Sequence, residues 1–313
     1  MRLLFMGTPH YVVPVLQSLA AAPDVQVVAV YSPPDRPRGR GRQMETPPVK
    51  VSALELGLPV NQPPSLRPER VHQELAAYQP DVIIVAAYGK LLPPPVLATP
   101  PHGCLNIHPS LLPRYRGPSP VATAILDGAD TTGVTLMLLD EGMDTGPVIF
   151  QREYALTGRE TAEPLTAALF QLGAEVLLDC LPSWIAGRLA ARPQDEARTT
   201  VTRKLQRSDG IADWLLPATS LERQSRAYKP WPGLFAQWQG QVLKLLEVVP
   251  LPTAATTHAG PGQVVQLTAG ETAVGVGTGK GVLGLITIQL EGRRPQSAGD
   301  FLRGYPQFIG AQL

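Results

Sequence analysis

Short β-branched runs alternate with longer helical patterns in the first half of the chain, and this alternation restricts the fold more than any other feature. The strand-like runs are residues 2–6, 25–31, 81–87 and 104–107, and helical patterns follow Pro9 and lie near 46–56 and 68–78. Further strands at 133–139 and 148–154 flank a glycine-bounded turn, and a long helix follows at 161–187. Strands that alternate with helices pack as an open sheet with helices on both faces. We therefore predict a Rossmann-like α/β domain with a mostly parallel sheet.

The pattern changes after residue 200. Residues 188–200 are polar and lack apolar periodicity, as linkers do. A short helix is expected at 219–228, and short strands between Gly- and Pro-rich turns at 235–238, 242–248, 263–267, 273–276 and 282–289. Such strands predict a small all-β, OB-like barrel. The length of 313 residues suits two domains, which we place at 1–188 and 207–313 with a linker at 189–206.

Composition excludes several classes of protein. A net charge of +1 gives no global attraction to nucleic acid, so an anionic partner needs a local basic patch. The two cysteines, Cys104 and Cys180, lie far apart, which argues against a zinc ribbon or a disulfide scaffold. No apolar run looks long enough to span a membrane, so we expect a cytoplasmic protein without membrane contact.

The fourth predicted strand ends in Leu105-Asn-Ile-His108. Alternation along a strand directs Asn106 and His108 to the same face, and ligands of open parallel sheets bind beyond the carboxyl ends of strands. An amide and an imidazole together suit the stabilisation of an oxyanion on a carbonyl carbon under attack. The alternative is that Asn106 caps the following turn and His108 packs there, and chemistry alone favours neither.

The loop Leu139-Asp-Glu-Gly-Met-Asp-Thr-Gly146 carries three carboxylates. It lacks the ligand spacing of a calcium loop, and no His or Cys lies near it in the sequence, so we predict no metal. A solvated turn explains Gly142 and Gly146. If the loop sits beside the preceding strand end, Asp144 would orient His108.

An arginine-rich loop directly follows the second predicted strand. Arg36, Arg38, Arg40 and Arg42 alternate with Gly and Pro and have only Asp35 as an acidic neighbour. Such a loop suits phosphate contacts, although a merely solvated loop is the alternative.

The stretch Asn106-Ile-His-Pro-Ser-Leu-Leu-Pro-Arg-Tyr-Arg-Gly117 resembles the folate-dependent formyltransferases. That family combines an Asn-x-His strand end, a Ser-Leu-Leu-Pro stretch and a later Asp in a glycine-flanked loop. Similar motifs run from Phe5-Met-Gly-Thr-Pro9 to Arg226-Ala-Tyr-Lys-Pro-Trp-Pro232, so the resemblance covers the chain end to end. Pro109 departs from the Gly or Ala that bacterial members often carry, but it leaves the catalytic interpretation intact.

The resemblance implies formyl transfer from 10-formyltetrahydrofolate, as co-substrate, to an amine without a covalent intermediate. Asn106 and His108 would donate to the oxyanion, and Asp144 would hold His108 and help to remove the amine proton. The residues that would contact folate are Tyr88, Gly89, Leu92, Ser110, Leu111, Leu112, Pro113, Leu139 and Asp140.

The arginine loop and the second domain point, within that family, to an amine carried by methionyl initiator tRNA. The residues expected to contact tRNA are Arg36, Arg38, Arg40, Arg42, Arg203, Lys204 and Arg207, with Tyr228 and Trp231 for stacking. We expect a monomer. Two alternatives stay open: a formyltransferase or formyl-folate hydrolase acting on small molecules, and an RNA-binding protein with a catalytically silent α/β half.

Overall fold

The computed structural model describes residues 1–38, 43–251, 259–268 and 272–313. The chain divides into two units. The first contains residues 1–120, 131–156 and 164–203, and the second contains residues 121–130, 157–163 and 204–313. The chain therefore passes from one unit to the other more than once.

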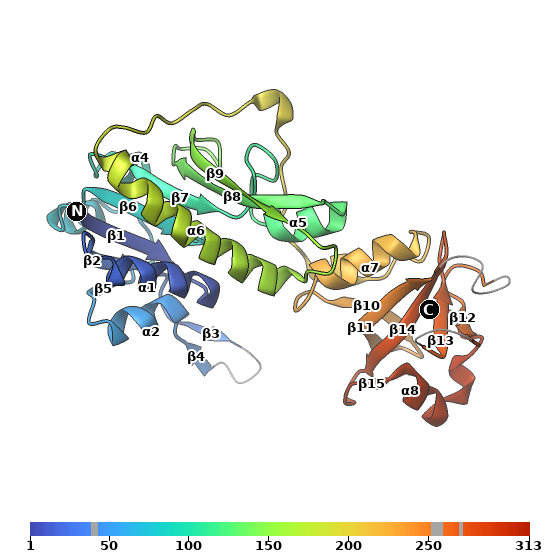
Figure 1. The fold of residues 1–313 in the computed structure, drawn as a ribbon. Coiled ribbons are helices and arrows are strands. Elements are labelled where there is room, and N and C mark those ends of the chain that lie inside the picture. Colours follow the sequence, from blue (N-terminus) through green and yellow to red (C-terminus); the bar gives the residue numbers. More distant parts are fainter. Residues whose placement is uncertain (39–42, 252–258, 269–271) are drawn as a thin grey trace. The chain divides into compact units, whose positions relative to one another are not determined.

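The first unit is built on a seven-stranded sheet (Figure 1). Its strand order is β5 (Val60–Asn61), β2 (Gln26–Tyr31), β1 (Arg2–Gly7), β6 (Val82–Ala86), β7 (Cys104–His108), β8 (Thr131–Leu138) and β9 (Val148–Ala155). Pairing is parallel from β5 to β7 and antiparallel for β8 and β9. The mostly parallel sheet predicted from the sequence is thus confirmed.

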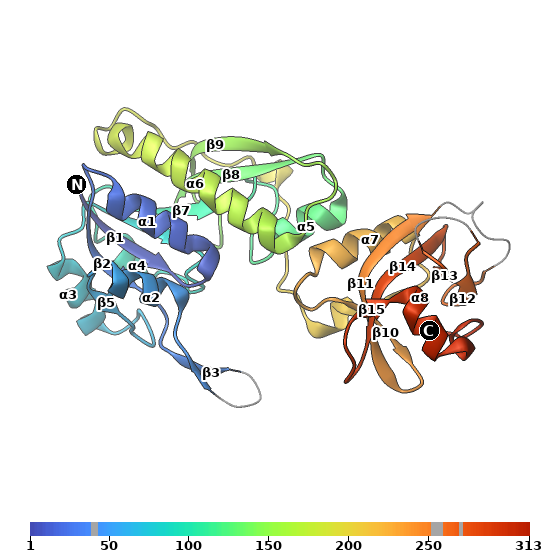
Figure 2. The same cartoon turned by 60° about the horizontal axis from the view of Figure 1, so that its bottom comes forward.

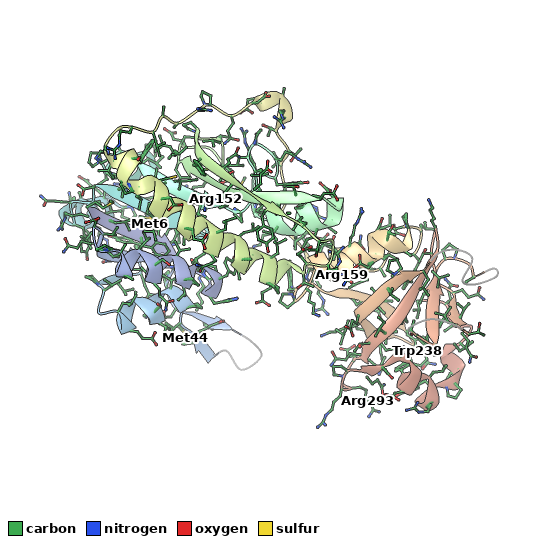
Figure 3. All side chains as sticks on the ribbon, in the orientation of Figure 1. Met6, Met44, Arg152, Arg159, Trp238 and Arg293 are labelled. Carbon is green, nitrogen blue, oxygen red and sulfur yellow. The ribbon has the colours of Figure 1, made fainter. Side chains whose placement is uncertain are left out.

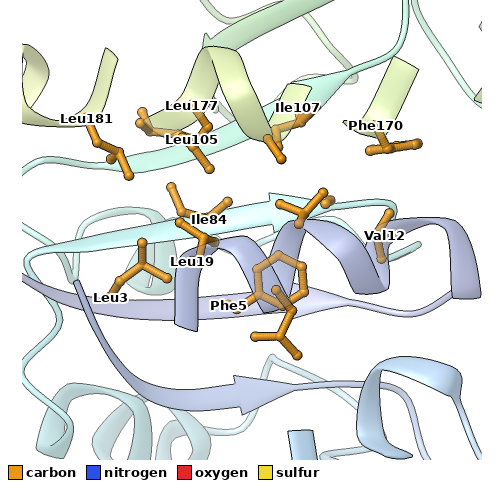
Figure 4. Close-up of a cluster of buried hydrophobic side chains, with 14 of the residues drawn as sticks. Leu3, Phe5, Val12, Leu19, Ile84, Leu105, Ile107, Phe170, Leu177 and Leu181 are labelled. Atoms are coloured by element: carbon orange, nitrogen blue, oxygen red, sulfur yellow. The ribbon is translucent and has the colours of Figure 1, made fainter. Parts of the chain in front are cut away.

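Helices cover both faces of this sheet. On one face, α1 (Val13–Ala21), α2 (Pro48–Glu55) and α6 (Ala162–Ile185) enclose a core that includes Leu105 and Ile107 (Figure 4). On the other face, α3 (Glu69–Ala77) and α4 (Pro94–Leu97) pack against alternate residues of the same strands, and this second core includes Cys104.

Alternation along β7 places Asn106 and His108 on the same face as Cys104, away from α6. The contacts of His108 are with the backbone of Tyr115 and the carboxylate of Asp144, and both residues lie in loops.

Helix α6 is long and apolar enough to cross a membrane, by length and composition alone. The sequence pattern did not predict an apolar stretch of this length. Half of its most apolar window is buried inside the protein, and Phe170, Leu177 and Leu181 face the sheet (Figure 4). It is packed as a core helix.

The second unit is a curled antiparallel sheet, which confirms the predicted all-β character of its framework. The strand order is β10 (Leu234–Trp238), β11 (Gln241–Leu251), β14 (Val282–Leu290), β13 (Val274–Gly277) and β12 (Val264–Gln266), and β15 (Gln296–Ser297) pairs with β14. Helices α5 (Pro120–Asp127), α7 (Ala218–Ala227) and α8 (Ala298–Gly304) belong to this unit almost entirely. Trp238 is labelled in Figure 3. Its ring meets those of Phe301 and Phe308 edge to face in the core of this unit.

The arginine-rich loop contains a hairpin that the sequence analysis did not predict. Strands β3 (Arg36–Arg38) and β4 (Gln43–Glu45) pair antiparallel and project from the first unit (Figure 2). Asp35 anchors the base of the hairpin, because its carboxylate accepts hydrogen bonds from Lys50 and Gln62. These hydrogen bonds, that from Gln62 first, hold the pKa of Asp35 below its usual value.

Close packing between α6 and β7 requires glycine at position 173. A Cβ there would overlap with Cγ2 of Ile107, which stands between Asn106 and His108. Overpacking costs about 1–3 kcal/mol, more than the ~1 kcal/mol that Ala gains over Gly in a helix. We expect Gly173→Ala to lower the free energy of unfolding by about 1–2 kcal/mol, measured by urea denaturation.

Gly304 in α8 is the control, because a Cβ at this position would meet nothing within 4 Å. Gly304→Ala should leave stability unchanged or raise it. Equal stability of Gly173→Ala and the unmodified protein would contradict the packing described for α6.

Candidate active site

Asn106 and His108 lie at the carboxyl end of β7, as predicted. His108 is buried, with 4% of its surface exposed, whereas Asn106 is only half-buried. Among the residues that the structure describes, none makes a hydrogen bond to the Asn106 side chain. The half-buried amide is therefore available to a ligand, which does not fit the alternative that it caps the following turn.

Both ring nitrogens of His108 face oxygen atoms that only accept hydrogen bonds. Nε2 lies 3.0 Å from the carbonyl oxygen of Tyr115, and Nδ1 lies 3.6 Å from Oδ2 of Asp144. The first distance is a direct hydrogen bond in which Nε2 donates, and the second is longer than one. In the doubly protonated ring, Nδ1 is thus the nitrogen that can donate to a further group.

Asp144 reaches His108 by a route that the sequence did not reveal. Because β8 is antiparallel to β7, Leu138 lies opposite Leu105, so the loop that carries Asp144 begins at the far end of β7. The loop returns across the sheet face, and Asp144 adopts a positive φ of 56°. The backbone N–H of Gly117 then donates to Oδ2 of Asp144 at 2.8 Å.

Asp140, another acidic residue of this loop, has different surroundings from Asp144. Asp140 is exposed and accepts hydrogen bonds from the backbone of Gly142 and the hydroxyl of Thr145. It is the turn residue, whereas Asp144 is the carboxylate that contacts His108. The structure therefore separates the two roles that the sequence left open for this loop.

The segment after His108 is fixed by one buried hydroxyl. Oγ1 of Thr135 donates to the carbonyl oxygen of Ser110 at 2.6 Å and accepts from the backbone N–H of Leu112 at 3.1 Å. The Gln151 amide adds hydrogen bonds to this hydroxyl and to the carbonyl oxygen of Leu112. The Ser-Leu-Leu-Pro stretch is thereby attached to β8 and β9.

The residues predicted to contact folate fall into two groups. The side chains of Tyr88, Leu92, Ser110 and Leu112 are buried in the protein. The remaining residues, Gly89, Leu111, Pro113, Leu139 and Asp140, are exposed or half-buried. Burial raises the pKa of Tyr88 to about 12, so this phenol stays neutral. Because all four of these side chains are buried, any contact that these residues make with folate must come from their backbone groups.

Two exposed apolar side chains lie in the segments from which folate contacts are expected, residues 86–92 and 139–144. Leu91 follows β6 and is 70% exposed, and Met143 lies in the Asp144 loop and is 54% exposed. Large apolar residues that project from loops near polar groups are typical of binding sites for aromatic rings. No periodic pattern marks them, because both lie in irregular loops.

The predicted phosphate-binding residues are only partly described. Arg36 is exposed, and its charge, after burial, is the second cause that lowers the pKa of Lys90. The backbone of Arg38 belongs to β3, whereas Arg40 and Arg42 lie outside the described residues. Arg203, Lys204 and Arg207 are exposed.

The aromatic residues expected to stack on nucleic acid differ in exposure. Tyr228 is only 5% exposed, so its ring packs within the protein, whereas Trp231 is 54% exposed. Within residues 1–38, 43–251, 259–268 and 272–313, no group of three or more His, Cys, Asp or Glu residues is placed to hold a metal ion.

Sequence comparison matches both parts of the chain to known families. Residues 1–181 match the formyl transferase family, and residues 204–306 match the C-terminal domain of formyl transferases. The methionyl-tRNA formyltransferase of Chloroflexus aggregans is 48% identical over 97% of this chain and 97% of its own length. That of a Roseiflexus species is 47% identical over 100% of this chain and 95% of its own length.

Solved structures share the fold at lower sequence identity. HypX from Aquifex aeolicus in complex with tetrahydrofolic acid matches 99% of this chain at 20% identity, with a TM-score of 0.63. The chain spans about half the length of that protein, since 48% of HypX is covered. Methionyl-tRNA formyltransferase from Clostridium thermocellum matches 80% of this chain and 93% of its own length at 16% identity, with a TM-score of 0.56.

The Thr135 hydroxyl gives a prediction about the loop that follows His108. Thr135→Val keeps the shape of the side chain but leaves buried backbone groups of Ser110 and Leu112 without their partner. An unsatisfied buried group costs about 1–3 kcal/mol. We expect Thr135→Val to lower the free energy of unfolding by roughly 2–3 kcal/mol, and Thr135→Ser to retain most of it, both measured by chemical denaturation.

Thr132 on the same strand is a matched control. It is also buried, but its hydroxyl has no hydrogen-bond partner among the described residues. Thr132→Val should therefore be neutral or stabilising. A similar loss of stability in both valine variants would show that the hydroxyl of Thr135 has no special role.

Proposed function

The chain belongs to the formyl transferase family, and from this premise we propose that it transfers the formyl group of 10-formyltetrahydrofolate to the α-amine of methionyl initiator tRNA. The near-complete coverage of relatives with that name supports the choice of acceptor. One observation carries the chemistry: the amide of Asn106, which no described residue binds, lies on the same strand face as His108, which in turn contacts Asp144.

Asn106 supplies a neutral hydrogen-bond donor to the formyl oxygen. When the amine nitrogen attacks the formyl carbon, that oxygen gains negative charge, and a donor placed in advance stabilises it without reorganisation. Because no protein group competes for the Asn106 amide in the described chain, its N–H groups need not break a hydrogen bond first.

His108 and Asp144 act as a pair. Nε2 of His108 donates to Tyr115, so in the cationic form of the ring Nδ1 donates towards the developing oxyanion or towards Asp144. The carboxylate of Asp144 orients the ring and accepts, directly or through water, the proton that the attacking amine must lose. The new bond joins the amine nitrogen to the formyl carbon, the bond from that carbon to the folate nitrogen breaks, and that nitrogen takes up a proton.

The exposed residues near the site fit a folate ring system. A Cβ at Gly89, which has a φ of +80°, would meet nothing within 4 Å, so the space beside this backbone is open. Leu91 and Met143 offer apolar side chains, and loop backbone offers hydrogen-bonding groups for a pterin edge. 10-Formyltetrahydrofolate supplies the one-carbon unit when it is bound.

The acceptor is proposed to bind through the exposed basic residues. Arg36, Arg38, Arg40 and Arg42 of the arginine-rich loop would contact phosphates, as would Arg203, Lys204 and Arg207 in the segment after α6. Phosphate contacts fix the position of a nucleic acid without reading its sequence, so a net charge of +1 is compatible if these residues act locally. The protein would work in the cytoplasm as a monomer, with residues 1–188 catalytic, 189–206 a linker and 207–313 binding tRNA.

The proposed function predicts that His108→Ala loses formylation activity but keeps its affinity for tRNA. Removal of one oxyanion donor costs roughly 3–4 kcal/mol, so we expect kcat for formylation of methionyl initiator tRNA to fall about 100- to 1000-fold. The affinity for tRNA, measured by filter binding, should change little. The assay uses 10-formyltetrahydrofolate and follows formylmethionyl-tRNA.

Free methionine and other small amines form the second arm of this assay. Efficient formylation of a small amine in the absence of tRNA would favour a metabolic formyltransferase instead. Unchanged turnover in His108→Ala would refute the mechanism. Tight tRNA binding by the unmodified protein without any formylation would indicate an RNA-binding protein with a silent α/β half.

A further inference from the structure

The polar segment after α6 packs tightly on the loops of the candidate active site. Arg192 forms a β-bridge with Val148, directly after the Asp144 loop. Further along, the backbone N–H of Thr202 donates to the carbonyl oxygen of Arg116 at 2.7 Å, and that of Arg116 donates to Thr200 at 2.9 Å. Residues 192–202, termed the return segment here, thus join the two loops that surround His108 (Figure 1).

Gln194 is the residue of the return segment that reaches the Asp144 loop. Its side-chain amide nitrogen donates to the carbonyl oxygens of Asp144 at 2.8 Å and of Gly146 at 2.7 Å. Its amide oxygen accepts a hydrogen bond from Nε of Arg116 at 3.0 Å. Every polar atom of this side chain is used, and each contact has the geometry of a direct hydrogen bond.

Arg116 completes the network from the other side. Arg116 is only 5% exposed, and its guanidinium donates two hydrogen bonds to the Glu196 carboxylate, at 3.1 and 2.7 Å. The hydrogen bond from Arg116 is the largest cause that holds the pKa of Glu196 below its usual value. A buried guanidinium needs such partners, so Gln194 and Glu196 together fix its position.

The position of Arg116 in the sequence connects this network to the chemistry. The preceding residue, Tyr115, offers the carbonyl oxygen that holds Nε2 of His108. The following residue, Gly117, offers the N–H that holds Oδ2 of Asp144. The same side chain that fixes Arg116 also binds the backbone of Asp144, so Gln194 restrains both partners of the His108–Asp144 contact at once.

The backbone of Asp144 needs this restraint. Its φ of 56° lies in the left-handed region, which non-glycine residues adopt only when surrounding contacts hold them there. Two contacts do so: the Gly117 N–H on the carboxylate and the Gln194 amide on the carbonyl oxygen. Without Gln194, Asp144 keeps the hydrogen bond to its carboxylate but loses the one to its carbonyl oxygen.

We propose that Gln194 is a positioning residue for formyl transfer, acting through Asp144, and that the return segment is part of the catalytic unit rather than a passive connection. This inference rests on the proposed function. It assigns the residue no contact with either substrate. Its effect on the reaction comes from the placement of the Asp144 carboxylate beside His108.

The test compares Gln194→Leu with Gln73→Leu. Gln73 also donates a hydrogen bond from its side-chain amide, to Oε1 of Glu69 at 3.4 Å, but it is exposed on α3. A small displacement of a reacting group lowers the rate by up to about 100-fold. We expect Gln194→Leu to lower kcat about 10- to 100-fold with KM for both substrates changed less than about threefold, and Gln73→Leu to leave kcat unchanged.

A readout that does not depend on activity is hydrogen exchange of the Gly117 amide, whose N–H is bound to Asp144. This amide should exchange faster in Gln194→Leu and at the normal rate in Gln73→Leu. Normal kcat together with normal exchange in Gln194→Leu would overturn the inference. If the unmodified protein forms no formylmethionyl-tRNA but the Gly117 amide still exchanges faster in Gln194→Leu, the proposed function is refuted and the hydrogen-bond network is retained.

A double variant separates positioning from general damage. If Gln194 acts through Asp144, Gln194→Leu should add little to the loss caused by Asp144→Ala, so that the two effects are strongly non-additive. If the double variant instead loses activity by the product of the two single losses, Gln194 acts elsewhere and the inference is overturned. The melting temperatures of all variants identify any that are unfolded at the assay temperature.

Discussion

The hydrogen bond from the backbone N–H of Gly117 to the carboxylate of Asp144 holds the candidate active site together. It joins two loops that are separated by 27 positions in the sequence, and it places the carboxylate 3.6 Å from Nδ1 of His108. His108 itself is fixed by β7 and by Tyr115. The contact between imidazole and carboxylate therefore depends on where these loops lie.

The sheet and the loops contribute differently to this arrangement. Burial of Leu105 and Ile107 against the core of α1, α2 and α6 turns Asn106 and His108 to the opposite face. On that face His108 contacts the carbonyl oxygen of Tyr115 and the carboxylate of Asp144, which lie in two loops that Gln194 of the return segment connects. A rigid strand thus presents the two donors, and a network of hydrogen bonds delivers the carboxylate.

The sequence predicted the features that follow from periodicity. The strand alternation gave the parallel sheet, and the period of two on β7 was sufficient to place Asn106 and His108 together. The roles of Asn106, His108 and Asp144 came from the resemblance to folate-dependent formyltransferases, because chemistry alone left the first two undecided. The family is confirmed by matches to both parts of the chain.

Other features could not be predicted because they depend on irregular backbone. Asp144 approaches His108 only because its loop folds back over the sheet, which the antiparallel direction of β8 would not suggest. Gln194 lies in a polar stretch without periodicity, so nothing in the sequence distinguishes it from solvated residues. The β3–β4 hairpin was not predicted because its short strands, Arg-Pro-Arg and Gln-Met-Glu, contain no β-branched residue.

The central claim is that the carboxylate of Asp144, held beside His108, drives formyl transfer. Its most direct test is the single-turnover rate of formyl transfer to methionyl initiator tRNA in Asp144→Asn. Asparagine can still accept the Gly117 hydrogen bond, so the loop keeps its place while the charge and the proton acceptor are lost. The account predicts a rate at least about 100-fold lower with unchanged stability. A rate within about threefold of that of the unmodified protein would contradict it.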